Sequence, residues 1–304
     1  MMLYPLHVKP IYKDYVWGGN QIQTLFNRKT PFPRVAESWE ISDREEGMSF
    51  IENGPLAGKS LHDIFIHQKK ELMGKDTHYK KFPLLIKLID ARENLSVQVH
   101  PSDATASATH GEAKSEAWVI LKAKPKSTLY AGLKGPISKE QLHGERIIDL
   151  MQVHSAHAGD VINIPGGRLH AIGAGIVLFE VQQNSNTTYR VYDWGRGRPL
   201  HHKEAEKALL EGDIEDPHIS PQILEENPRH RQTLLLSTPH FSIEKWEIFE
   251  TIQWPKIPDQ CEMLFCLEGK NSLVPVGRSC LLPASCPPIT ITTTRSTFFR
   301  TLLP

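Results

Sequence analysis

The stretch GDVINIPGGRLH, residues 159–170, is the most informative part of this sequence. A glycine and a five-residue, mostly apolar run come first, and Pro165, Gly166 and Gly167 separate that run from His170. The run has the length and composition of a β-strand, and a proline followed by glycines is typical of a tight turn. Because glycine adopts positive φ without steric cost, the chain can fold back closely and direct His170 inward at the start of the next strand. The spacing therefore predicts a strand, a turn and a presented histidine, which an ordinary core histidine would not require.

Similar strand-like runs continue on both sides of this stretch, each short, rich in β-branched residues and bounded by turn residues. They are PLLIKLID (83–90), LSVQVHP (95–101), EAWVIL (116–121), GIVLFEVQ (175–182), NSLVPV (271–276) and ITITTT (289–294). Helical spacing is confined to 60–73, with Ser60 as N-cap and Gly74 as the stop, to 138–153 and to 202–210. Because strands and helices do not alternate regularly, we predict a mostly β sandwich or jelly roll with helical insertions.

A polar, proline-containing connector at about 211–232 divides the chain. A length of 304 residues allows about two domains. We therefore predict a first domain over residues 1–232, which contains the turn, and a smaller C-terminal β domain over residues 233–304.

Charge and cysteine content exclude several classes of protein. Lys and Arg total 35, as do Asp and Glu, and this balance disfavours a nucleic-acid or membrane-surface binder. No apolar run approaches the ~20 residues that span a bilayer, and the amino terminus does not have the pattern of a secretory signal. We therefore expect a cytoplasmic protein whose four cysteines, Cys261, Cys266, Cys280 and Cys286, are free thiols.

Two further segments carry polar side chains with strand periodicity. In LSVQVHP, alternation places Ser96, Gln98 and His100 on one face and three apolar residues on the other. In KSEAW, residues 114–118, Lys114 and Glu116 share a face. Each segment alone is also compatible with a solvated surface, where an exposed ion pair contributes little to stability.

Together with His170, these segments predict a metal site. Gln98, His100, Glu116 and His170 supply two imidazoles, a carboxylate and an amide oxygen, a mixed set that suits a divalent first-row metal and zinc above all. Nearby Lys114 and Arg190 would make the pocket positive and attractive to an anionic, oxygen-rich substrate.

The turn pattern resembles the second motif of the cupin barrels, and the chain as a whole resembles the type I mannose-6-phosphate isomerases, zinc-dependent enzymes of that fold. The matching stretches are PIYKDYVWGG (10–19), AESWEIS (36–42), FPLLIKLIDARENLSVQVHPSD (82–103), KSEAW, GDVINIPGGRLHAIGAG (159–175) and VQQNSNTTYRVYDWGR (181–196). The resemblance covers about two thirds of the chain in order. It implies a cupin jelly-roll barrel with a cupin-like C-terminal domain.

The resemblance also implies roles for single residues. The family binds one zinc ion per chain. Its ligands correspond to Gln98, His100, Glu116 and His170, the same four residues that the spacing of the motifs predicts. The catalytic arginine falls on Arg190, the flanking serine and lysine on Ser96 and Lys114, and a carboxylate proposed to act in the family falls near Glu180. Relatives usually carry a small or hydroxyl residue at Arg168, and the arginine here would narrow the pocket mouth or contact phosphate.

The implied reaction interconverts mannose 6-phosphate and fructose 6-phosphate through a cis-enediol. Lys114, Glu180 or a metal-bound water is each chemically able to act as the base. Two other classes fit the same residues: a non-catalytic sugar-phosphate-binding cupin and an iron-dependent cupin dioxygenase. The expected partner is a phosphorylated sugar, and the sequence makes no prediction of the oligomeric state.

Overall fold

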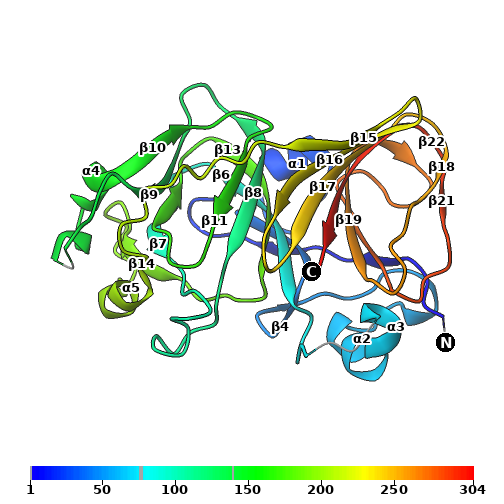
Figure 1. Ribbon diagram of the computed structural model, residues 1–304, viewed down its shortest axis with the longest axis horizontal. Helices are drawn as coiled ribbons and strands as arrows, with labels where there is room; N and C mark the ends of the chain where they lie inside the picture. The colour runs from blue at the N-terminus through cyan, green and yellow to red at the C-terminus, as the bar shows by residue number, and fades with distance from the viewer. Residues whose placement is uncertain (1, 75–77, 139) are drawn as a thin grey trace.

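The protein consists mainly of antiparallel strands arranged in two halves (Figure 1). The computed structural model describes residues 2–74, 78–138 and 140–304. One half is a sandwich of two sheets, which we call the N-terminal sandwich, and the other is built on one large sheet, which we call the C-terminal sheet. The predicted mostly β, jelly-roll fold with helical insertions is confirmed.

The inner layer of the N-terminal sandwich is a six-stranded sheet. Its strands are, in spatial order, β11 (Val161–Ile164), β8 (Glu116–Ala123), β13 (Ile176–Gln183), β6 (Leu84–Ala91), β3 (Glu37–Ile41) and β2 (Ile11–Lys13). Every residue of β6 is buried, because this sheet is covered on both faces. A strand covered on both faces loses the apolar–polar alternation of a surface strand, which explains the nearly continuous apolar run at residues 84–91.

The outer layer is a five-stranded sheet that faces the first. Its strands are β10 (Met151–Ser155), β9 (Thr128–Leu133), β12 (His170–Ile172), β7 (Val97–Val99) and β14 (Tyr189–Tyr192). Buried side chains from both sheets, including Trp118, Leu129 and Ile172, form one hydrophobic cluster. The two sheets therefore enclose a common interior, as in a jelly roll.

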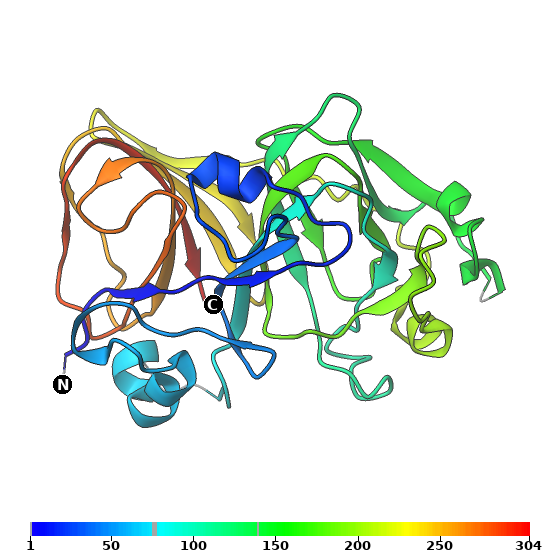
Figure 2. The same cartoon turned by 180° about the vertical axis from the view of Figure 1, so that it is seen from behind.

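The C-terminal sheet has seven strands and includes one from the opposite end of the chain. In order they are β1 (Leu6–Val8), β20 (Ser279–Leu282), β19 (Glu262–Asn271), β22 (Thr293–Leu302), β17 (Ser242–Ile248), β16 (His230–Ser237) and β15 (Gln222–Glu226). Seen from behind, the chain begins beside this sheet, and the N-terminal segment then runs across the molecule toward the N-terminal sandwich (Figure 2). A single cluster of buried apolar residues, among them Leu88, Phe179, Phe265 and Phe299, joins the two halves.

The connector between the halves leads directly into the C-terminal sheet. The predicted boundary between residues 232 and 233 lies inside β16, and the β15–β16 hairpin already belongs to that sheet. The division of the chain into two domains stays a prediction. Two pairs of short strands complete the fold: β18 (Ile252–Gln253) with β21 (Thr290–Ile291), and β4 (Asp43–Arg44) with β5 (Gly47–Met48).

The helices are short and lie outside the sheets. They are α1 (Gln21–Phe26), α2 (Leu61–His67), α3 (Lys69–Met73), α4 (Ile147–Leu150) and α5 (His202–Ala208), with 3-10 turns η1 (Gly54–Leu56) and η2 (Glu140–Leu142). Ser60 caps α2 in a reciprocal capping box with Asp63, and Gly74 ends α3, as predicted, but the single helix predicted over 60–73 is divided at Gln68 into α2 and α3. The segment predicted at 202–210 is α5. Among the described residues, no helix is long and apolar enough to cross a membrane.

Two predicted elements are wrong. The helix predicted over 138–153 is interrupted at Gly144, which has a φ of +80°, and residues from Met151 onward form β10 instead. Residue 139 of that prediction lies outside the described residues. The strand predicted at 271–276 is wrong beyond Asn271, the last residue of β19: residues 272–276 form a turn, in which the Asn271 side chain accepts hydrogen bonds from the backbone of Leu273 and Val274. The four cysteines are free thiols, as predicted, and all four are buried.

Candidate active site

The predicted turn carries the chain from one sheet of the N-terminal sandwich to the other. Strand β11 pairs with β8, so that Ile164 lies opposite Glu116, and after the turn β12 pairs with β7, so that His170 lies opposite Gln98. His100 follows β7 directly. The turn thus brings residues that are far apart in the sequence to one place between the two sheets.

Close packing at this turn depends on its glycines. Gly167 has a φ of +98°, and its backbone N–H donates to the His100 carbonyl at 2.7 Å. A Cβ on Gly166 would lie 2.6 Å from the Cα of Ser102, so only glycine permits this approach. The turn is therefore attached to the segment that carries the other histidine.

Two histidines and a glutamate form a buried cluster. One ligand atom each from His100, Glu116 and His170 lies within 4.8 Å of the others. His100 Nε2 is 3.5 Å from Glu116 Oε2, His170 Nε2 is 3.4 Å from Glu116 Oε1, and the Gln98 amide is 3.3 Å from His170 Nε2. The alternative that the polar faces of LSVQVHP and KSEAW are solvated surface is wrong, because both histidines and Glu116 are at most 2% exposed.

The ring of His170 is held in one orientation. Its Nδ1–H donates to the Arg168 carbonyl at 2.9 Å, which leaves the Nε2 lone pair directed at Glu116. The Arg168 side chain points elsewhere: it is buried and forms a two-pronged ion pair with Asp213, with both contacts at 2.7 Å. The expectation that Arg168 narrows the pocket mouth or contacts phosphate is therefore wrong, because its guanidinium is already paired with a buried carboxylate.

The protonation states of the cluster suit a metal. Burial and the nearby Lys114 ammonium lower the pKa of His100 to about 3, and burial also lowers the pKa of His170. Burial would raise the pKa of Glu116, but Lys114 and the two imidazoles outweigh it and hold that pKa well below its ordinary value. Neutral imidazoles beside an ionised carboxylate are the forms that bind a divalent metal, so the donor set fits one.

Two charged residues that the sequence did not single out, Lys87 and Glu37, lie beside this cluster with Glu180. The Lys87 ammonium is 3.2 Å from Glu180 Oε2 and 3.5 Å from Glu37 Oε2, and the Trp118 indole N–H donates to Glu180 Oε1 at 3.1 Å. Burial raises the pKa of Glu180, although Lys87 opposes the rise. Burial would lower the pKa of Lys87, but Glu180 and Glu37 outweigh it and raise that pKa. A lysine inside the apolar run 83–90 was the signal that could have identified this group.

These groups line a polar cavity of about 300 Å³. The predicted site residues Ser96, Gln98, Lys114, Glu116, Glu180 and Arg190 all line it, as do Glu37, Lys87 and Arg198. The two histidines contact Glu116. Lys114 Nζ lies 3.0 Å from both Glu116 Oε2 and His100 Nε2. The structure thus brings all the predicted site residues to one location.

Arginines form one side of this cavity. Asp193 pairs with Arg196 and Arg198, whereas Arg190 Nη1 donates to the Pro199 carbonyl at 2.8 Å. The Nε of Arg190 is buried and has no hydrogen-bond partner among the described residues. Arg190 therefore retains a donor for an anionic ligand.

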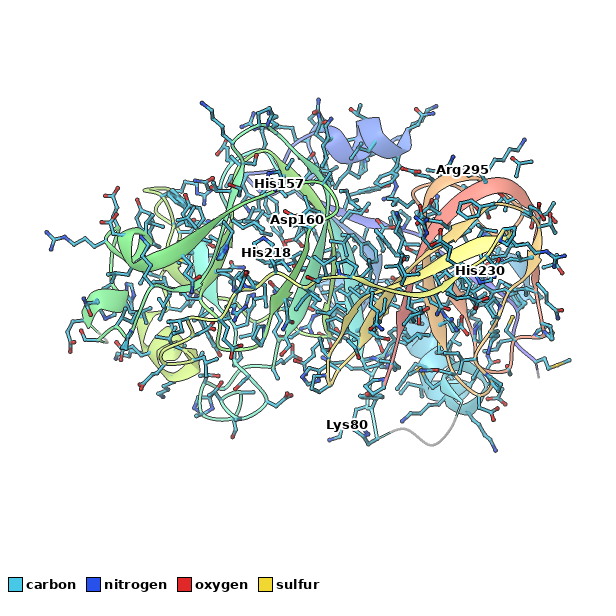
Figure 3. All side chains as sticks on the ribbon, turned by 45° about the horizontal axis from the view of Figure 1, so that its top comes forward. Lys80, His157, Asp160, His218, His230 and Arg295 are labelled. Carbon is cyan, nitrogen blue, oxygen red and sulfur yellow. The ribbon has the colours of Figure 1, made fainter. Side chains whose placement is uncertain are left out.

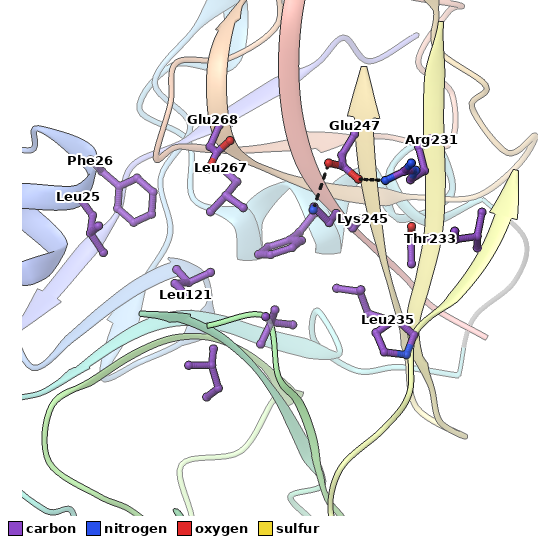
Figure 4. A pocket seen from close by; sticks show the side chains of 16 residues that line it. Leu25, Phe26, Leu121, Arg231, Thr233, Leu235, Lys245, Glu247, Leu267 and Glu268 are labelled. Carbon is purple, nitrogen blue, oxygen red and sulfur yellow. Dashed lines mark ion pairs between the residues drawn. The ribbon is translucent and has the colours of Figure 1, made fainter. Parts of the chain in front are cut away.

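A larger cavity of about 490 Å³ lies between the two halves of the molecule (Figure 4). Its lining is mainly apolar, with Leu25, Phe26 and Leu235 among the side chains, and Glu247 pairs with both Arg231 and Lys245 at its edge. A hydroxyl-rich, anionic ligand fits the smaller polar cavity better, because unpaired donors and acceptors are available there.

Comparisons with known proteins agree with this geometry. Residues 5–125 match the family model of the type I phosphomannose isomerase catalytic domain. The chain is 34% identical over 266 residues to a mannose-6-phosphate isomerase of Streptococcus mutans, covering 83% of this chain and 81% of that protein. It is also 34% identical over 262 residues to the mannose-6-phosphate isomerase ManA of Bacillus subtilis, covering 80% and 79%. A crystal structure of the mannose 6-phosphate isomerase from Bacillus subtilis has a TM-score of 0.89 and 27% identity, covering 99% of this chain and 100% of that chain.

Proposed function

This chain belongs to the type I phosphomannose isomerases, and we propose that it interconverts mannose 6-phosphate and fructose 6-phosphate with the help of one zinc ion. The observation that carries the proposal is the buried cluster of two imidazoles and a carboxylate beside a polar cavity that Lys114 and Arg190 also line. We further propose that the enzyme acts in the cytoplasm, which its four free cysteines support.

The proposed ligands of the metal are Gln98, His100, Glu116 and His170. Two nitrogen donors with oxygen donors suit zinc, and both histidines and Glu116 are buried. When bound, the ion supplies Lewis-acid chemistry that stabilises negative charge on the sugar oxygens.

Arg190, with Ser96 and Lys114, is proposed to bind and orient the substrate. The unpartnered Nε of Arg190 supports this role, because an unpaired buried donor gains most from an anionic partner. Lys114 and Ser96 line the same cavity and offer further donors to substrate oxygens.

Glu180 is proposed to move the proton between C1 and C2 of the sugar. In the aldose-to-ketose direction, its carboxylate takes the proton from C2 while O1 gains a proton, which gives the cis-enediol. The same group then returns its proton to C1 while O2 loses one, so that the net change on the oxygens is the transfer of one proton from O2 to O1. A raised pKa supports this role, because a base is most effective when its pKa approaches the working pH. Lys114 is less suited, since its ammonium contacts Glu116 and His100. Lys87 and Trp118 are proposed to hold the carboxylate in place.

A coupled assay on mannose 6-phosphate tests the proposal. We expect turnover that disappears after chelator treatment and returns with added zinc. Binding of the sugar phosphate without turnover would instead identify a sugar-phosphate-binding protein. Bound iron with oxygen uptake and no isomerisation would identify a dioxygenase.

A further inference from the structure

A second group of metal-binding side chains lies away from the proposed active site. His154 belongs to β10, while Asp216 and His218 belong to the segment 211–221 between α5 and β15. One ligand atom from each of these three residues lies within 4.8 Å of the others. Figure 3 shows His218 on this segment where it passes the N-terminal sandwich. We propose that these residues form a second divalent-metal site.

The arrangement of the two imidazoles supports this proposal. The ring centroids of His154 and His218 are 5.1 Å apart with an interplanar angle of 65°. In the cluster of the candidate active site, the rings of His100 and His170 are 4.8 Å apart at 55°. The two ring pairs thus have similar centroid separations and interplanar angles, although they come from different elements.

A hydrogen bond also orients the ring of His154 so that its other nitrogen is available to a metal. Its Nε2 lies 3.2 Å from the Ala131 carbonyl, and because a carbonyl only accepts, this nitrogen donates. The Nδ1 lone pair is then available to an ion. Metal-binding histidines are usually oriented by such a bond to a backbone carbonyl.

Asp216 is the third proposed ligand and lies on the same segment, 211–221, as His218. Its Oδ1 lies 2.7 Å from His218 Nδ1 and accepts the His218 backbone N–H at 3.0 Å. The Asp216 side chain is 73% exposed and that of His218 34%, so water can reach the remaining coordination positions. Two imidazoles and one carboxylate favour Zn²⁺, Co²⁺ or Ni²⁺ over Mg²⁺ and Ca²⁺, which prefer oxygen ligands.

A metal at this site would clamp the segment 211–221 to the N-terminal sandwich. Asp213 on the same segment already pairs with Arg168, and the Asn163 backbone N–H donates to the Pro217 carbonyl at 2.9 Å. The ion would add a link to β10 at the edge of the outer sheet. Its main effect should therefore be on stability, not on turnover.

The test compares the wild type with His218→Gln and with a matched control, His157→Gln. His157 is a 74% exposed histidine next to Asp160 and lies outside the cluster. After removal of metal by chelator and dialysis, each protein is titrated with Zn²⁺, and bound metal and the melting temperature are measured. We expect His218→Gln to bind one equivalent less than the wild type and to lose part of the Zn²⁺-induced rise in melting temperature, while the control does neither.

A second variant removes another ligand of the proposed site, and an activity measurement shows that the variants fold. His154→Gln removes a ligand from the other element and should lose the same equivalent. Both variants should retain isomerase turnover, which separates this proposal from the proposed function and shows that they fold. Equal metal content in the wild type and both variants would overturn the proposal, as would loss of the same equivalent in His157→Gln.

Discussion

Replacing Arg168 by methionine should destabilise the protein strongly. Arg168 follows the turn that presents His170, and its side chain runs to Asp213 on the segment 211–221. Both side chains of the pair are 3% exposed. Methionine retains much of the apolar stem but removes the charge, and Asp213 is left buried without its partner.

The expected loss follows from the contacts that disappear. Breaking a buried ion pair by removing one partner costs about 3–5 kcal/mol, because the remaining charge stays desolvated. Arg168 Nη1 also donates to the Asn163 carbonyl at 3.0 Å. We therefore expect Arg168→Met to lower the free energy of unfolding by about 4 kcal/mol. The backbone carbonyl of residue 168 orients His170, and a shift of this backbone once the side chain loses its partner should also lower metal affinity by about 10–100-fold.

Denaturant unfolding and metal titration measure the two effects. The double variant Arg168→Met/Asp213→Leu is the control, since it removes both charges and should recover much of the lost stability. A loss below about 1 kcal/mol for the single variant, or an equal loss in the double variant, would show that a desolvated charge is not the cause.

Three further predictions concern the turn and the proposed base. Gly166→Ala places a Cβ 2.6 Å from the Cα of Ser102, and we expect a loss of about 1–3 kcal/mol in unfolding free energy together with lower bound metal, measured by denaturation and metal analysis. Glu180→Gln should lower kcat by about 10²–10⁴-fold with metal content unchanged, and an unaltered kcat would contradict the proposed base. Because burial raises the pKa of Glu180 and the base must be ionised, kcat should fall as pH decreases through a value above the ordinary pKa of glutamate. A kcat profile recorded with bound metal checks this, and a fall only below that ordinary value would contradict it.

Local sequence signals predicted elements well where a short-range interaction determines them. Ser60 and Asp63 form their capping box within a single turn of helix, so their spacing is sufficient. Gly144 shows the opposite case, because the periodic residues around it favoured a helix while the chain adopts positive φ there and continues into β10. Helical periodicity over 138–153 was outweighed by the pairing of β10 with β9.

Buried charges were harder to interpret from the sequence. Lys87 lies in an apolar run, and only the neighbouring strands show that it faces Glu180 and Glu37. Arg168 follows the predicted turn, yet its partner Asp213 lies 45 residues further along the chain. The direction of each side chain depends on a partner that local spacing does not reveal.

Strand periodicity, the turn before His170 and the donor types that suit a metal could all be predicted from the chain alone. These features depend on interactions within a few residues, such as strand alternation and the freedom of glycine at positive φ. The folded molecule was needed to see that Arg168 pairs with Asp213, that Lys87 contacts Glu180, and that β1 joins the C-terminal sheet. Those contacts join residues distant in the sequence, and they form because the folded chain must pair its buried charges and its sheet edges.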